Sequence, residues 1–284
     1  MINSLRTDLK QNVCSLRFLI SSAVLLGLFL MGTGVPDTDI YGVEPCTILK
    51  MLLTTNESVW MQSPCFSASE IWQNGLRVLN LGAFLPLIMS YPVLPLLTDE
   101  LKTQNYRFHC VRSSYRVYAL SKCFAGMLTA CLAAAICTVI FWLICWAILP
   151  APSAYIGMPE VQFYGTEIPL GKMAQLAVLL MACAAADALI GILLAAVTVD
   201  KFASLSLPVV IAFTAAQIAQ KLYIKQGHDP RWFCLSPNYL YQPDLWFSAF
   251  SERISPWAVL LIPVTISAVC VLLTEFTMKG RMSQ

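Results

Sequence analysis

The sequence predicts an all-α membrane protein with six transmembrane helices. Hydrophobic residues make up 58% of the 284 residues and charged residues only 12%, whereas an ordinary soluble domain is about one quarter charged. The apolar residues gather in runs that reach or exceed the roughly 17 residues a helix needs to cross a bilayer. These runs lie at residues 18–35, 71–97, 119–149, 173–199, 202–224 and 257–277.

The distribution of charge orients these spans. Eleven of the 18 Lys and Arg residues fall in the two termini and the connections after spans two and four, and ten of the 16 acidic residues fall in the other connections. Because positively charged segments stay in the cytoplasm, we expect both termini to be cytoplasmic. No long linker or low-complexity segment interrupts residues 1–284, so we expect a single multi-pass domain in the plasma membrane.

The first segments predict an anchored N-terminus. Residues 1–17 carry Arg6, Lys10 and Arg17, a pattern typical of an amphipathic helix along the inner membrane surface. A basic start followed by a short apolar run also resembles a secretory signal, but no pair of small residues marks a cleavage site before residue 35. We therefore expect the first span to stay in the protein.

The acidic connection at residues 36–71 is the largest external segment. Cys46 and Cys65 lie in it, on the oxidising side of the membrane, and are candidates for a disulfide. Cys234 falls on the same side and competes as a partner. Free thiols in a reducing setting are the alternative.

Prolines predict that the second span bends or breaks. Pro86, Pro92 and Pro95 all lie in its inner half. Each proline removes a backbone donor and clashes with the preceding helical turn. We expect the irregularity just before the polar connection to span three.

That connection, residues 98–122, is the most strongly charged stretch of the chain. A charge at mid-bilayer costs at least about 3 kcal/mol, so the segment must lie outside the hydrocarbon. Thr98 or Asp99 is suited to cap a helix N-terminus, and aromatic residues alternate with the charges. The sequence thus predicts a short amphipathic cytoplasmic helix, with a solvated connecting loop as the alternative. The cations are Lys102, Arg107, Arg112, Arg116 and Lys122, and the acids are Asp99 and Glu100.

The last four spans differ in composition. The third is longer than a bilayer requires and should tilt or project beyond it. The fourth has small residues at helical spacing, such as Ala184, Ala188 and Ala195, which let helices approach closely in lipid. Asp200 and Lys201 form a very short turn to the fifth span. Residues 225–256 are rich in Trp and Tyr and predict interfacial or re-entrant helices before the sixth span.

No catalytic or metal site is predicted. The chain has two histidines, His109 and His228, and neither an H-E-x-x-H nor a G-x-S-x-G pattern. It has no G-x-x-x-x-G-K-[ST] phosphate loop, so any ATP used would be bound by another chain. We expect the bilayer and other proteins as partners, and no nucleic acid.

Asp187 is the candidate residue for a translocation path. It lies in the middle of the fourth span among small residues, and an ionisable group at that depth is a functional hypothesis by default. It could pair with Arg77 or Lys221, both nearer the outer face. A packed, hydrogen-bonded aspartate between helices is the alternative.

This arrangement resembles the membrane subunit of an ABC-2-type exporter. The residues that carry the resemblance are Asp99 or Glu100 after the second span, the basic-aromatic stretch 114–118, Ser121 with Lys122, and residues 235–240 before the last span. The resemblance implies a bacterial permease that pairs with a second copy or a paralogue. It also implies a separate cytoplasmic ATPase that binds ATP and Mg²⁺ and contacts a coupling helix between spans two and three.

On this interpretation the polar connection supplies the contacts to the ATPase. Its acids would pair with cations of the ATPase, and its aromatic residues would fill an apolar cleft. A six-span sensor, immunity or scaffold protein that transports nothing is the alternative function. The substrate is not readable, although the aromatic external face favours an amphipathic compound or peptide. The predicted coupling residues are Asp99, Glu100, Tyr106, Phe108, Arg112 and Arg116.

Overall fold

The computed structural model describes residues 2–32, 47–53, 67–76, 81–112, 114–149, 170–225 and 256–282. These residues are almost entirely helical and include no β-strand, which confirms the all-α class. Four helices are long and apolar enough to cross a membrane, or up to six if each of two bent helix pairs crosses as one span. The chain is therefore a helical, multi-pass membrane protein.

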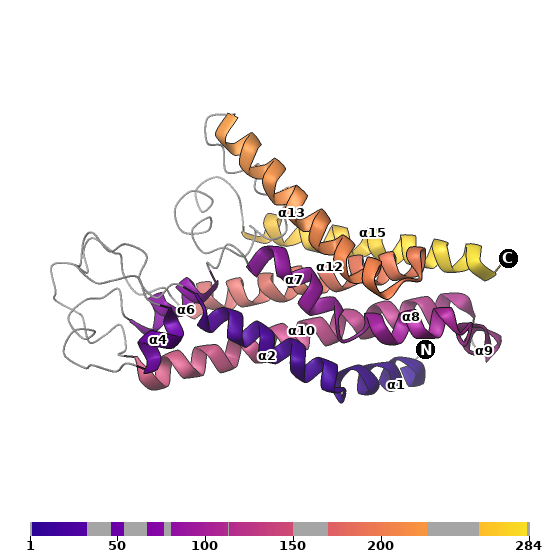
Figure 1. Ribbon diagram of the computed structural model, residues 1–284, viewed down its shortest axis with the longest axis horizontal. Coiled ribbons are helices and arrows are strands. Elements are labelled where there is room, and N and C mark those ends of the chain that lie inside the picture. Colours follow the sequence, from indigo (N-terminus) through magenta and orange to yellow (C-terminus); the bar gives the residue numbers. More distant parts are fainter. Residues whose placement is uncertain are drawn as a thin grey trace.

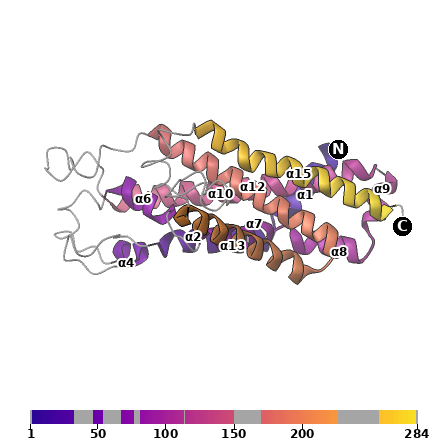
Figure 2. The same cartoon turned by 90° about the horizontal axis from the view of Figure 1, so that it is seen from above.

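The helices form an elongated bundle (Figure 1). Helices α4 and α6 lie at one end, and α9, the start of α1 and the end of α15 lie at the other (Figures 1 and 2). We call the second one the charged end, because Asp8, Glu100, Lys122, Asp200 and Arg281 lie there. The helices are α1 (Ile2–Val13), α2 (Leu16–Leu30), α4 (Ile48–Leu53), α6 (Ala68–Leu76), α7 (Leu81–Ser90), α8 (Leu94–Lys102), α9 (Tyr106–Arg112), α10 (Tyr115–Ile148), α12 (Leu170–Thr198), α13 (Lys201–Lys225) and α15 (Pro256–Met282).

The N-terminal helix and the first span are two helices that meet at a bend of 58°. Ser15 makes the junction: its hydroxyl donates to the Asn12 carbonyl at 2.6 Å and accepts from the Phe18 amide at 3.2 Å. Serine is a favoured N-cap, so α2 starts where the sequence places a polar residue before the apolar run. The preceding helix α1 packs along α10 and buries Asp8 and Asn12.

The predicted second span is divided among α6, α7 and α8. A turn at residues 91–93 separates α7 from α8, and the two axes differ by 62°. The turn contains Pro92, and Pro95 lies in the first turn of α8, where proline is favoured. The break predicted from the prolines is confirmed.

The prediction that Thr98 or Asp99 caps a helix is wrong. Helix α8 already begins at Leu94, because Pro95 starts it one turn earlier. Thr98 lies inside the helix, fully buried, and its hydroxyl donates to the Leu94 carbonyl at 2.9 Å.

Helix α12 is the central helix of the bundle. In the most apolar 18-residue stretch of α12, 67% is buried inside the protein, whereas in the other three long apolar helices the buried share of such a stretch is 33% or less. It contacts α7, α10, α13 and α15, and its alanines at 184, 188 and 195 are fully buried. The close packing predicted from its small residues is confirmed.

Helix α10 is the longest element, with 34 residues. It begins after Ser114, whose hydroxyl accepts from the Val117 amide at 3.4 Å, and it corresponds to the predicted third span. At 1.5 Å per residue it is about 51 Å long, well beyond the roughly 30 Å of a hydrocarbon core. Helices α13 and α15 correspond to the fifth and sixth predicted spans, and α15 continues to Met282.

Several predictions lie outside the described residues. These are the pairing of Cys46 with Cys65 or Cys234, the position of Arg77, and the interfacial or re-entrant helices within residues 226–255. They stay predictions.

Candidate functional site

Three charged side chains meet inside the charged end. Lys122 of α10 places its Nζ 2.9 Å from Oδ1 of Asp8 on α1 and 2.7 Å from Oε1 of Glu100 on α8. Only 8% of the Lys122 side chain is exposed. We call Asp8, Glu100 and Lys122 the buried triad, because it joins three helices through one ammonium group.

The remaining carboxylate oxygens of the triad are also bonded. Oδ2 of Asp8 accepts from the Ser121 hydroxyl at 2.6 Å, and Oε2 of Glu100 accepts from the Tyr118 hydroxyl at 2.7 Å. Tyr118, Ser121 and Lys122 are three and four residues apart, which places them on one face of α10. Breaking a buried ion pair by removing one partner costs about 3–5 kcal/mol, so the triad fixes α1 and α8 to α10.

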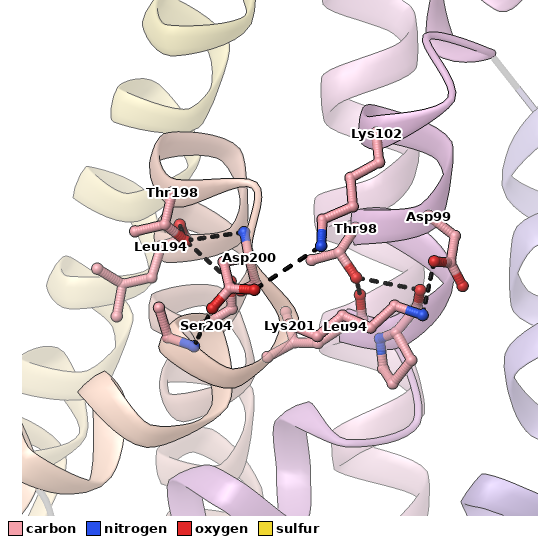
Figure 3. Close-up of polar contacts among 11 residues, drawn as sticks. Leu94, Thr98, Asp99, Lys102, Leu194, Thr198, Asp200, Lys201 and Ser204 are labelled. Atoms are coloured by element: carbon pink, nitrogen blue, oxygen red, sulfur yellow. Dashed lines mark hydrogen bonds and ion pairs between the residues drawn. The ribbon is translucent and has the colours of Figure 1, made fainter.

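A second set of ion pairs at this end is exposed. Nζ of Lys201 lies 2.6 Å from Oδ1 of Asp99, and Nζ of Lys102 lies 3.7 Å from Oδ1 of Asp200 (Figure 3). Oδ2 of Asp200 accepts from the Ala203 amide at 3.0 Å and thereby caps α13. Exposed pairs of this kind contribute about 1 kcal/mol or less to the free energy of folding. Their main effect here is to hold the turn between α12 and α13 beside α8.

Helix α9 turns two of its apolar residues outward. Phe108 is 74% exposed and Val111 is 84% exposed, and their spacing of three places them on the same face. Tyr106 points the other way and is buried against the bundle. Cys110 packs on the inner side, where burial raises the pKa of its thiol, so it behaves as a small neutral group. Helix α9 thus has an anchored face and a free apolar face.

The six predicted coupling residues differ in whether they face into the bundle or outward. Glu100 and Tyr106 point into the bundle and are bound within the chain. Asp99 is half-exposed, but Lys201 of the same chain pairs with it. Phe108 points outward.

The other two predicted coupling residues lie further along the chain. Arg112 is the last residue of α9. Nε of Arg116 lies 2.8 Å from Oε1 of Glu275 on α15. This contact joins the start of α10 to the sixth predicted span.

Asp187 lies at the centre of the bundle. It is 2% exposed, and its Oδ2 has no hydrogen-bond partner among the described residues. The Ser90 hydroxyl donates to its main-chain carbonyl at 3.3 Å, which places it beside the break between α7 and α8. Lys221 is exposed on α13 and forms no ion pair with Asp187.

Two features at the charged end are absent from the sequence predictions. One is the partnership of Asp8 with Lys122, which joins residues more than a hundred positions apart. The signal that could have suggested it is that Asp8 is the one acidic residue in the basic segment 1–17. The other is Arg281, whose Nε and Nη2 donate to the carbonyls of Ala196 and Val197 at 2.8 and 3.0 Å.

Within the part of the chain that the structure describes, no three His, Cys, Asp or Glu side chains are grouped as metal ligands. No protein-family model matches the chain, and no curated protein matches it. The candidate site therefore depends on its own geometry: a buried ionic junction beside an outward-facing apolar helix.

Proposed function

We propose that this chain is the permease subunit of an ATP-driven exporter in the bacterial plasma membrane. In this proposal it crosses the membrane six times with both termini in the cytoplasm. It pairs with a second permease copy or paralogue, and a separate ATPase subunit binds and hydrolyses ATP with Mg²⁺. The exported compound is an amphipathic molecule or peptide.

The observation that carries the proposal is the exposed apolar face of α9. Phe108 and Val111 lie on a short helix at the charged end, in the connection between the second and third predicted spans. Exposed apolar surface rimmed by polar residues marks contacts with proteins or membranes, and the position of this pair outside the predicted spans favours a protein. The exposed cation Arg107 beside the pair suits a partner cleft with an acidic rim.

The connection of α9 to the bundle supports a mechanical role. Tyr106 packs in the same buried cluster as Tyr118 of α10, and the triad fixes α8 to α10 through Glu100 and Lys122. A push on α9 would therefore reach α10 through packed and ion-paired side chains. Packed side chains, salt bridges and rigid helices of this kind can carry energetic coupling between distant sites.

The test is a double variant, Phe108→Ala with Val111→Ala. We expect it to lower both the ATPase that co-purifies with the chain from native membranes and the export it drives, while the melting temperature stays unchanged. Both side chains are exposed, so their removal leaves no cavity. Phe202→Ala is the matched control, because Phe202 is 83% exposed at the start of α13 and should leave the ATPase bound.

Two outcomes would contradict the proposal. One is wild-type ATPase recovery from the double variant. The other is a wild-type chain that carries no ATPase out of its native membrane. Either result would favour the alternative of a six-span sensor, immunity or scaffold protein.

A further inference from the structure

A cavity of about 420 Å³ opens at the charged end between α8, α9, α12 and α15. Lys102 and Arg107 line it from the α8–α9 segment, and Arg281 lines it from the end of α15. No acidic residue is among its lining residues within the described chain. Three cations from separate helices thus face one open space, which we call the basic cavity.

These three cations keep hydrogen-bond donors for a ligand. Arg281 uses Nε and Nη2 on two main-chain carbonyls, and a guanidinium has five N–H donors in total. Arg107 makes one long contact, from Nε to the Tyr106 hydroxyl at 3.5 Å. Lys102 lies 3.7 Å from Asp200, which is longer than a hydrogen bond.

The nearby carboxylate does not neutralise the basic cavity. Asp200 is the acid closest to Lys102, and its other oxygen caps the N-terminus of α13. Its charge is thereby shared with the helix dipole. The basic cavity therefore keeps an excess of positive charge. A phosphate group suits this cavity, because the planar guanidinium groups of its two arginines match the geometry of phosphate oxygens.

The surroundings of the basic cavity suit an amphiphile. Val197, whose carbonyl accepts from Arg281, is 56% exposed at the end of α12, and Leu273 is 47% exposed about two turns before Arg281 on α15. The cations therefore lie where an exposed apolar helix surface meets the charged end. Lipid headgroups meet the acyl region at the same boundary, and basic pockets between membrane helices bind anionic headgroups.

We propose that the basic cavity binds the phosphate headgroup of an anionic phospholipid, with the acyl chains along α12 and α15. Arg107 and Lys102 donate to the phosphate from one side and the free guanidinium donors of Arg281 from the other. This site needs neither an ATPase nor a substrate, although Arg107 also borders the outward apolar face of α9.

The test measures binding to the purified full chain in neutral detergent. The probes are dihexanoylphosphatidylglycerol, dihexanoylphosphatidylcholine and sodium phosphate, and the readout is the dissociation constant. We expect the phosphatidylglycerol to bind most tightly. We expect Lys102→Gln with Arg107→Gln to weaken it at least about tenfold, since hydrogen bonds to charged groups are the stronger kind.

The variants are chosen so that folding does not confuse the result. Lys102 and Arg107 are exposed, whereas Arg281 also holds the end of α12 and is left intact. Lys279→Gln is the matched control, because Lys279 is exposed on α15 and is not among the residues that line the basic cavity. It should change the dissociation constant less than about twofold, as expected of a surface charge outside the site.

Three results would overturn the proposal. Equal weakening by Lys279→Gln and by the double variant would reduce the effect to general surface charge. If sodium phosphate bound as tightly as dihexanoylphosphatidylglycerol, the ligand would be a soluble phosphate and not a lipid. Binding of an acidic peptide that depends on Arg107, with no binding of phosphatidylglycerol, would assign the basic cavity to a protein partner.

Discussion

Two buried acidic sites in this molecule have opposite surroundings. At the charged end, Asp8 and Glu100 share Lys122, and each has a hydroxyl on its second oxygen. At the centre of the bundle, Asp187 is more deeply buried, at 2% exposed, but its Oδ2 has no partner among the described residues. The first site is satisfied within the chain, and the second leaves an acceptor available.

The difference supports a structural role for the triad and leaves Asp187 as a candidate for a functional one. Buried charges that are fully paired rigidify the elements they join, and the triad joins α1, α8 and α10. An incompletely bonded acid in the middle of a membrane helix is costly and is typical of sites that handle protons, ions or substrates. Asp187 also lies beside the break between α7 and α8, where the chain departs from a continuous helix.

The largest expected effect comes from removing the cation of the triad. Lys122→Met should lower the free energy of unfolding by about 3–5 kcal/mol, because two buried carboxylates lose their counter-ion. Unfolding in detergent by mixed micelles of SDS would measure it.

Lys201→Met is the matched control, since Lys201 pairs with Asp99 at the same end but is 39% exposed. It should cost less than about 1 kcal/mol. Equal losses in the two variants would mean that burial does not distinguish these ion pairs.

The next effect comes from the packing beside Asp187. Gly191→Ala should lower the free energy of unfolding by about 1–3 kcal/mol, because the added Cβ would overlap the Ser90 side chain and lie 3.2 Å from Leu94. Gly27→Ala is the control, since nothing lies within 4 Å of its added Cβ. Its stability should rise by up to about 1 kcal/mol from helix propensity. A neutral Gly191→Ala would show that α12 and α7 have room to separate.

The smallest effect is expected at Asp187 itself. Asp187→Asn should change the free energy of unfolding by less than about 1 kcal/mol, because no described partner is lost and an unpaired charge is costly to bury. The same change at the charged end, Asp8→Asn, should cost about 1.5–3 kcal/mol, since Lys122 and Ser121 lose a charged acceptor. A large loss at Asp187 would reveal a buried partner, for which Arg77 is the candidate.

Much of the fold was predictable because it follows from local chemistry. Apolar runs located the long helices, and small residues indicated the close packing of α12. Pro92 and Pro95 predicted the break before α8. The error at Thr98 has a physical reason: a proline in the first turn sets a helix start more strongly than a later residue that is merely suited to cap it.

The candidate site was predictable only in part. Phe108 lies outward on a short helix as the sequence predicts. The inward positions of Glu100 and Tyr106 depend on Tyr118 and Lys122 of the following helix α10, and on Asp8, which is far away in sequence. Such contacts depend on how helices are placed in space, and hydrophobic periodicity carries no information about which charged residues will meet.

The length of α10 has a consequence for how motion would spread through the protein. This single unbroken helix touches α1, α9 and α7 and also reaches α6 at the opposite end. A tilt imposed on α10 at the charged end would displace its other end, beside α6, in the same movement. No chain of intermediate side chains is required to carry that displacement across the bilayer.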